Sequence, residues 1–175
     1  MANVNNPHGL AWLGICISGG PAMLEQFEKD ASEAAAIYPG DAVNQEADGN
    51  IEANSATPGT TLFSGVALDH GAALTLTKHR VIVSPDAIFE AQSDDDATGL
   101  VAADAGLNAN LILGAGNATT LKSGHEIDTS TKATTATLDV KLRKLLAVEG
   151  NAYGEFARFE IMFNNHRNAY AVAGV

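Results

Sequence analysis

The chain has only one cysteine, Cys16, in 175 residues, so no disulfide can form within it. This scarcity fits folding in a reducing cytoplasm. Long hydrophobic runs are also missing: LAWLGICI, at 10–17, is the only strongly apolar run near the N-terminus. A transmembrane helix needs about 20 such residues. No Lys or Arg precedes Lys29, which excludes the basic start of a signal peptide. We therefore expect no membrane association.

Positive charge is scarce as well. Ten Lys and Arg stand against 21 Asp and Glu, which gives a formal net charge of −11. Such a chain repels phosphate backbones, so we expect no nucleic-acid partner. The densest basic stretch is KLRKLL at 141–146. We interpret its Lys141, Arg143 and Lys144 as protection of a strand edge or as a solvated face.

What the sequence does contain is a series of short strand-like segments separated by turns. Apolar and polar residues alternate over 136–143, and the stretch 155–163 places Phe159, Ile161 and Phe163 on one side. An Asp48-Gly49 pair marks a hairpin turn. The pattern predicts a mainly β fold: a single antiparallel β-barrel or sandwich of about 7–8 short strands.

Two segments near the N-terminus depart from this pattern. One short helix is predicted over 22–36, where Leu24, Phe27 and Ala31 share a helical face. Residues 1–20 surround the apolar run with Asn, Pro and Gly, and are interpreted as an extended N-terminal arm before a β-rich domain at 21–175. A first strand tucked into the chain's own core fits the same residues equally well.

No constellation of residues predicts catalysis. GAGN at 114–117 lacks the third small residue and the following helix of a dinucleotide-binding fingerprint, which leaves a glycine hairpin or wide loop. The five histidines have no zinc-ligand spacing. Cys16 lies in an apolar run, where its pKa should be normal or raised. We therefore predict no catalytic residue, no cofactor and no metal ion, and expect that the protein is not an enzyme.

Three consecutive aspartates, Asp94, Asp95 and Asp96, raise the question of a cation site. A calcium loop wants acidic residues at alternate positions and further oxygen ligands downstream. Adjacent side chains on an extended chain diverge, and Gly99 follows closely. We interpret the stretch as a solvated turn that ends the preceding strand, with a weak calcium site as the alternative.

Stretches along nearly the whole chain resemble one known family. They are MANVNNPHGL, SGG, GDAV with ADGNIEA, TPGTTLFSGV, VSPDAIFEAQ, GLNANLILGAGN, SGHEID, ATTATLDVKL and FNNH. They are similar to small structural proteins of tailed bacteriophages that are regarded as head decoration, or capsid cement, proteins. The resemblance implies a virion protein that is made in the host cytoplasm and binds the outer capsid surface. There it would bridge subunits of the major capsid protein, as a β-rich knob that forms homo-oligomers, commonly trimers.

The candidate contacts with the capsid or with another protomer come from the arm. They are its apolar residues Val4, Leu10, Trp12, Leu13 and Ile15. LAWLGICI departs from the family pattern, which is more basic and polar there.

Three other functions are alternatives to capsid decoration. Another virion β-domain, associated with a tail or fibre, shares this composition. A carbohydrate-binding module needs exposed aromatic rings, and Trp12, Tyr38, Tyr153 and Tyr170 are scattered. A metal-dependent enzyme would use Asp94 to Asp96 with a histidine.

Overall fold

The computed structural model describes residues 3–53, 58–60, 62–169 and 174. Within them the chain forms eleven strands and one short 3₁₀ helix, η1 (Ala102–Asp104). Among these residues no helix is long and apolar enough to cross a membrane. The strands are β1 (Ala11–Cys16), β2 (Leu24–Lys29), β3 (Ala42–Gln45), β4 (Ile51–Ala53), β5 (Gly65–Ala67), β6 (Thr77–Ile82), β7 (Ala87–Gln92), β8 (Asn108–Asn117), β9 (Lys122–Ala133), β10 (Val140–Leu145) and β11 (Arg158–Phe163).

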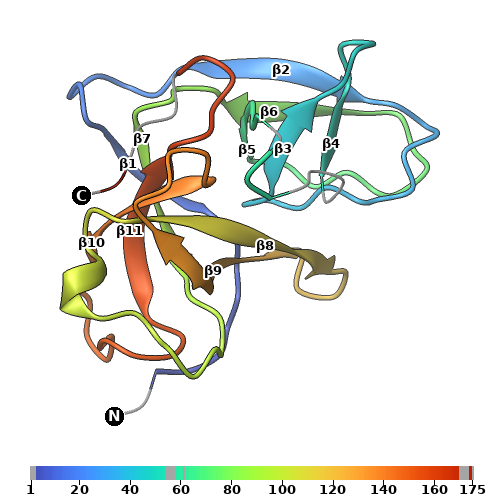
Figure 1. Ribbon diagram of the computed structural model, residues 1–175. Helices are drawn as coiled ribbons and strands as arrows, with labels where there is room; N and C mark the ends of the chain where they lie inside the picture. Colours follow the sequence, from blue (N-terminus) through green and yellow to red (C-terminus); the bar gives the residue numbers. More distant parts are fainter. Residues whose placement is uncertain (1–2, 54–57, 61, 170–173, 175) are drawn as a thin grey trace.

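The strands form two antiparallel sheets, as Figure 1 shows. The larger sheet has the order β1-β7-β11-β10-β8-β9, and the smaller has the order β2-β6-β5-β3-β4. The predicted mainly β, antiparallel fold is confirmed, with the two sheets of a sandwich and no closed barrel among the described residues. The described strands outnumber the predicted ones in part because β1 and β2 lie in segments for which an arm and a helix were predicted.

Alternating apolar residues of the larger sheet build most of the main core, which also includes residues of β3, β5 and β6 in the smaller sheet. Phe159, Ile161 and Phe163 of β11 are all buried, as their spacing predicts. The ring of Phe163 packs against those of Phe63 and Phe89, with ring centroids 5.5 and 5.8 Å apart. Burying each such side chain stabilises the fold by about 1.5–3 kcal/mol.

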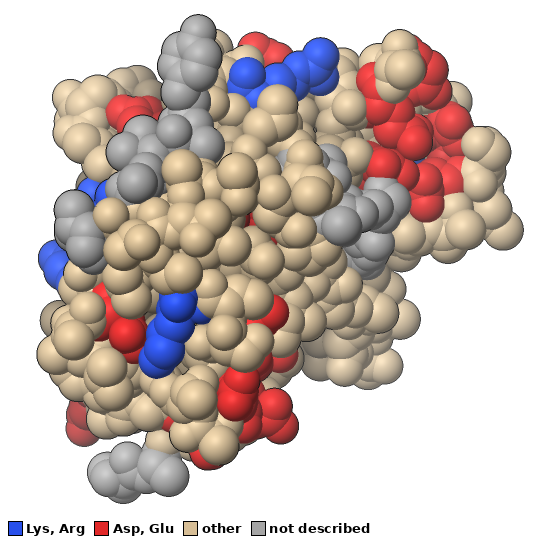
Figure 2. Space-filling model, viewed as in Figure 1, with Lys and Arg blue, Asp and Glu red and all other residues tan. Residues whose placement is uncertain are grey.

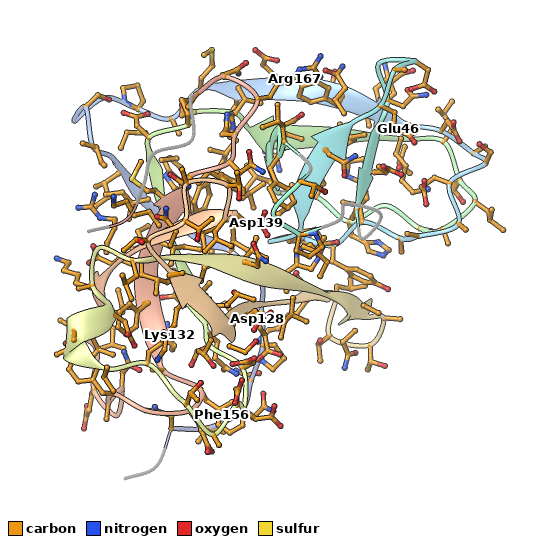
Figure 3. The ribbon with its side chains drawn as sticks, viewed as in Figure 1. Glu46, Asp128, Lys132, Asp139, Phe156 and Arg167 are labelled. Carbon is orange, nitrogen blue, oxygen red and sulfur yellow. The ribbon has the colours of Figure 1, made fainter. Side chains whose placement is uncertain are left out.

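A buried carboxylate lies near the middle of the molecule (Figure 3). Asp139, directly before β10, is 0% exposed. Its Oδ1 accepts a hydrogen bond from the Gly59 amide at 2.8 Å, and its Oδ2 accepts one from the Leu111 amide at 3.0 Å. Burial raises the pKa of this carboxyl, although the two backbone hydrogen bonds oppose the change. Asp139 thereby fixes the 58–60 turn against β8.

The prediction of a helix over 22–36 is wrong. Leu24–Lys29 form strand β2, which pairs with β6 continuously from Leu24 opposite Ile82 to Lys29 opposite Thr77. This pairing gives the backbone its hydrogen bonds without any helical turn. The chain then turns sharply at 31–32 instead of continuing a helix. Long-range strand pairing overrides a local helical pattern in this segment because propensity is a weak preference.

Strand β1 decides between the two interpretations of the N-terminal region. It pairs antiparallel with β7, with Ala11 opposite Glu90 and Cys16 opposite Ala87, at the edge of the larger sheet. Leu10 is 1% exposed and belongs to the main core. Residues 11–16 are therefore a first strand of the domain, and an arm that ends at residue 20 does not describe them.

The glycine-rich stretch 114–117 belongs to a hairpin, one of the two predicted alternatives, but it lies in a strand of the hairpin and not in its turn. It continues β8, and the turn of the β8–β9 hairpin follows at 118–121. A Cβ atom on Gly116 would lie 2.1 Å from the ring of Tyr38, and one on Gly114 would lie 2.4 Å from the Gly124 carbonyl oxygen. Glycine is therefore required for close packing and not for a turn.

Candidate functional site

The five predicted contact residues do not form one surface. Val4 is 77% exposed, Ile15 50% and Trp12 38%, whereas Leu13 is half-buried. Leu10 is buried in the core, so its prediction as a contact with a partner is wrong. The sequence pattern could not separate these positions because a single edge strand presents some residues to the core and others to solvent.

An apolar surface nevertheless exists at the end of β1. Ile15 and Ile17, on either side of the buried Cys16, are 50% and 53% exposed. Ile17 lines a hollow of about 380 Å³ together with Met162 of β11 and residues of β10. We call this surface the apolar–basic face. It consists of Ile17, Lys141, Arg143, Lys144 and Met162 of the hollow, together with the exposed Ile15, which lies two residues before Ile17 in the chain. Exposed apolar groups that gather beside charged groups are typical of protein–protein contact sites.

The basic part of this face comes from β10. Among the described residues, Arg143 and Lys144 both form ion pairs with Glu160. Arg143 Nε lies 3.9 Å from Glu160 Oε2, and Lys144 Nζ lies 3.2 Å from Glu160 Oε1. Strand β10 lies inside the larger sheet, between β11 and β8. The interpretation of these cations as edge protection is therefore wrong, since they lie on a sheet face. They give a local positive region on a chain whose net charge is −11.

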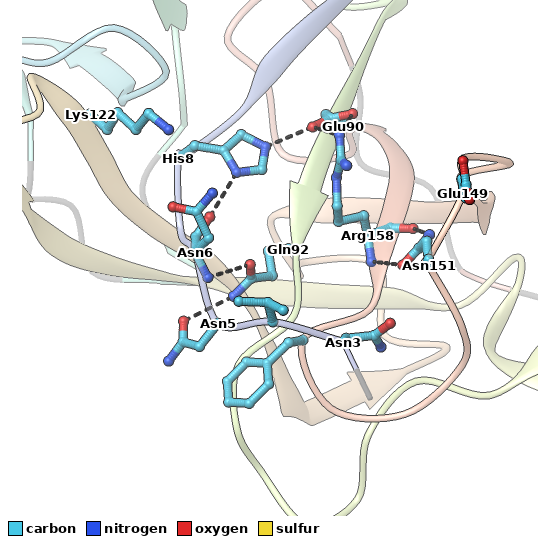
Figure 4. A pocket seen from close by; sticks show the side chains of 13 residues that line it. Asn3, Asn5, Asn6, His8, Glu90, Gln92, Lys122, Glu149, Asn151 and Arg158 are labelled. Carbon is cyan, nitrogen blue, oxygen red and sulfur yellow. Dashed lines mark hydrogen bonds and ion pairs between the residues drawn. The ribbon is translucent and has the colours of Figure 1, made fainter. Parts of the chain in front are cut away.

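A polar cleft of about 700 Å³ lies at the other end of β11 (Figure 4). The segment 3–8 passes over the larger sheet there and is held by side chains of β7. The Asn6 amide donates to Gln92 Oε1 at 2.9 Å, and Gln92 Nε2 donates to Asn5 Oδ1 at 3.1 Å. Asn3 adds bonds to the Ala152 backbone in both directions. The N-terminal segment is thus one wall of the cleft.

A charged triad forms the floor of this cleft. Glu90, which is 7% exposed, contacts His8 Nε2 through Oε1 at 2.7 Å and accepts hydrogen bonds from Arg158 Nη2 at 2.5 and 2.7 Å. Burial raises the pKa of Glu90, but the hydrogen bonds from His8 and Arg158 outweigh it and lower the pKa overall. The hydrogen bond to Glu90 raises the pKa of His8, against the opposing effect of burial.

The sequence reasoning missed this triad because its members come from distant segments. One signal was present: Glu90 alternates with Phe89 and Ala91 in a strand whose other face is apolar. A carboxylate at that position requires either solvent or cationic partners, and the fold supplies His8 and Arg158.

A second hollow of about 450 Å³ adjoins the cleft. The two share Asn3 and Phe156 as lining residues. Tyr153 of the second hollow is 48% exposed, and its ring packs edge-on against Phe159 with centroids 6.0 Å apart. The loop between β10 and β11 therefore presents two aromatic rings at this end of the molecule. Tyr170, the fourth aromatic residue weighed from the sequence, lies outside the described residues.

Two buried groups have the chemistry of an acid–base pair but not its accessibility. Asp41 Oδ1 and His125 Nε2 are 3.4 Å apart, and both side chains are 0% exposed. Burial raises the pKa of Asp41 to about 6 and lowers the pKa of His125 to about 3. His125 is therefore neutral at pH 7, and its Nδ1 accepts a hydrogen bond from the Ala42 amide at 3.1 Å. The pair links β3 to β9 and is closed to a substrate.

The three aspartates at 94–96 behave differently from one another. Asp94 is 8% exposed, and its Oδ1 accepts hydrogen bonds from Thr129 Oγ1 at 2.6 Å and from the Thr129 amide at 3.3 Å. Asp95 is exposed, and the Asp96 carbonyl accepts the Gly99 amide at 2.9 Å. A solvated turn describes Asp95 and Asp96, whereas Asp94 is a buried link to β9.

Another acidic group lies at the far end of the smaller sheet, where Figure 2 shows carboxylates gathered over β3 and β4. Side-chain oxygens of Glu33, Glu46 and Glu52 lie within 4.8 Å of one another. Burial and the neighbouring Glu52 raise the pKa of Glu46. Exposed acidic groups often gather without an ion, so the absence of a metal stays a prediction.

Comparisons of the chain with protein-family models, curated proteins and solved structures found no match. Two surfaces of the molecule bear on its function, the apolar–basic face and the polar cleft.

Proposed function

We propose that this protein is a capsid decoration protein. It binds the outer surface of a tailed-phage head and bridges neighbouring subunits of the major capsid protein. The resemblance of nearly the whole sequence to that family motivates the proposal. The apolar–basic face is the single structural observation that carries it, since it offers a contact site for a protein partner.

The face suits an acidic shell surface with apolar pockets. Ile15, Ile17 and Met162 supply apolar anchors, which dominate interface energies when they enter pockets of the partner. Lys141, Arg143 and Lys144 supply charge that guides the encounter and favours an acidic partner. Trp12 remains an exposed candidate, whereas Val4 lines the polar cleft and Leu10 is buried, so neither of these two belongs to this face.

The contact between one apolar–basic face and the shell is small, so oligomerisation of the protein strengthens its binding. A homo-oligomer with several such faces gains avidity through effective concentration, without stronger single contacts. The family resemblance implies that this oligomer is a trimer on the outer surface of the virion shell, made in the host cytoplasm. Light scattering coupled to size exclusion measures the mass directly. A monomer both in solution and on the shell would remove this part of the proposal.

The proposal is tested on phage heads that were assembled without the protein. Heads are mixed with the purified full chain and sedimented, and the bound protein is quantified. We expect wild-type protein to bind and the double variant Ile15→Asp, Ile17→Asp to lose binding at least about tenfold, because charges replace two apolar anchors. Leu76→Asp is the matched control, because Leu76 is 61% exposed and outside the face.

Charge reversal tests the basic part separately. Lys144→Glu should weaken binding most at low salt, since screening removes the electrostatic contribution at high salt. Binding that is unchanged in both face variants would overturn the assignment of this surface. Binding to purified tails and not to heads would overturn decoration and favour a tail-associated domain.

A further inference from the structure

The polar cleft and the hollow beside it form a groove that the decoration proposal does not use. Their volumes, about 700 and 450 Å³, are in the range of small-molecule sites. Arg158 of the cleft and Met162 of the apolar–basic face lie at opposite ends of β11. The groove and the face are thus separate surfaces of one domain.

The lining of the cleft indicates a neutral, hydroxyl-rich ligand. Among its lining residues the formal charges balance, since Lys122 and Arg158 stand against Glu90 and Glu149. Such a site does not favour an anion, and it is too polar for an apolar ligand. Amide groups supply the remaining polar chemistry, and each offers both a donor and an acceptor, as a hydroxyl group requires. The amides come from Asn3, Asn5, Asn6, Gln92 and Asn151.

The amides that shape the groove are held in place by bonds within the fold. Asn151 Nδ2 donates to the carbonyl oxygens of Leu146 and Arg158, both at 2.8 Å, and its Oδ1 accepts the Arg158 amide at 2.9 Å. Asn5 and Asn6, by contrast, are exposed on the N-terminal wall. A fixed frame with a few exposed polar groups lowers the ordering cost of binding.

Aromatic rings complete the groove. Phe156, common to both hollows, has a φ of 55°, a left-handed conformation that is costly for a bulky side chain. Backbone strain of this kind collects at ligand-binding sites. Figure 3 places Phe156 at the end of the molecule remote from Glu46. Tyr153 supplies a second, half-exposed ring in the adjoining hollow. Flat apolar rings beside hydroxyl-binding amides match a sugar, which has apolar C–H faces and a polar edge.

We propose that this groove binds a neutral oligosaccharide. Phe156 and Tyr153 contact the C–H faces of successive sugar rings, and the exposed Asn5, Asn6 and Lys122 bond their hydroxyl groups. The triad of His8, Glu90 and Arg158 fixes the floor and the N-terminal wall. The protein would then carry a second binding activity, for a carbohydrate surface, that is independent of its attachment to a shell.

The test uses the purified full chain and an array of neutral oligosaccharides, two to six hexose or N-acetylhexosamine units long, with heparin fragments as the anionic comparison. The best neutral ligand is then titrated by NMR, where we expect saturable shifts at residues of the groove. Tyr153→Ala should weaken binding about tenfold, because it removes one stacking ring. Phe156→Gly should do the same, and glycine tolerates the positive φ at that position.

Trp12→Ala is the matched control, since it removes an exposed aromatic ring that does not line the groove. It should bind like the wild type. Should Phe156→Gly fail to fold, the exposed Tyr153→Ala still decides the question. The proposal is overturned if no neutral oligosaccharide binds at millimolar concentration. It is also overturned if only heparin binds, or if both ring variants bind as tightly as Trp12→Ala.

Discussion

His166 provides a quantitative prediction of acid sensitivity. Its side chain is 1% exposed, and its Nδ1 accepts a hydrogen bond from the Asn168 amide at 3.0 Å. Burial lowers the pKa of His166 from 6.5 to about 4, and a backbone hydrogen bond with Ser64 only partly opposes this. The unfolded chain therefore binds a proton at higher pH than the folded chain does. The stability that the neutral side chain contributes is present above pH 6.5 and is lost as the pH falls toward 4.

The size of this effect follows from the two pKa values. At pH 5 the unfolded histidine is almost fully protonated and the folded one is mostly neutral. One pKa unit corresponds to about 1.4 kcal/mol, so His166 removes about 2 kcal/mol of stability between pH 7.5 and pH 5. His125 adds a loss of about 2 kcal/mol in the same way. Asp41, whose pKa is raised by burial to about 6, opposes these losses by about 1 kcal/mol.

The assay is equilibrium urea unfolding at pH 7.5 and at pH 5, for the wild type and for His166→Asn. Asparagine keeps an acceptor for the Asn168 amide but does not titrate. We expect the difference in unfolding free energy between the two pH values to shrink by about 2 kcal/mol in the variant. This difference is independent of any constant loss caused by the change of shape.

His8→Asn provides a check, because its effect on the pH dependence of stability should have the opposite sign. The pKa of His8 is raised, so its contribution is present below pH 6.5 and is lost as the pH rises through the folded pKa. His8→Asn should therefore enlarge the loss on acidification. The argument is refuted if His166→Asn shows the wild-type difference within about 0.5 kcal/mol, a precision that such unfolding curves allow.

Two further predictions concern stability. Deleting residues 2–17 should cost at least about 3 kcal/mol, because it removes the buried Leu10 and the strand that pairs with β7. Urea unfolding measures this, and an unchanged midpoint would restore the interpretation of the region as a dispensable arm. Asp139→Ala should cost about 2–4 kcal/mol, because the amides of Gly59 and Leu111 lose their acceptor. Thermal unfolding beside the exposed Asp95→Ala tests it, and equal melting temperatures for both variants would contradict it.

The local patterns of the sequence predicted many of the strands but not their neighbours. Alternation at 155–163 identified β11 and its buried Phe159, Ile161 and Phe163, and Asp48-Gly49 identified the β3–β4 turn, where Gly49 has a φ of 94°. These features depend on side-chain period and turn chemistry, which are properties of a few consecutive residues. Residues 22–36 show the limit of that information. Their apolar residues have a helical period, but residues 24–29 form a strand that pairs with β6.

The sequence by itself determined a mainly β, acidic chain with one cysteine and a hairpin at Asp48-Gly49. Only the tertiary structure decided what its polar and apolar residues do. It buried Leu10 and left Ile15 exposed, although both belong to one apolar run. It also brought His8 and Arg158 onto Glu90 from distant segments. Exposure and charge pairing depend on which strands become neighbours, and that choice is made by long-range packing.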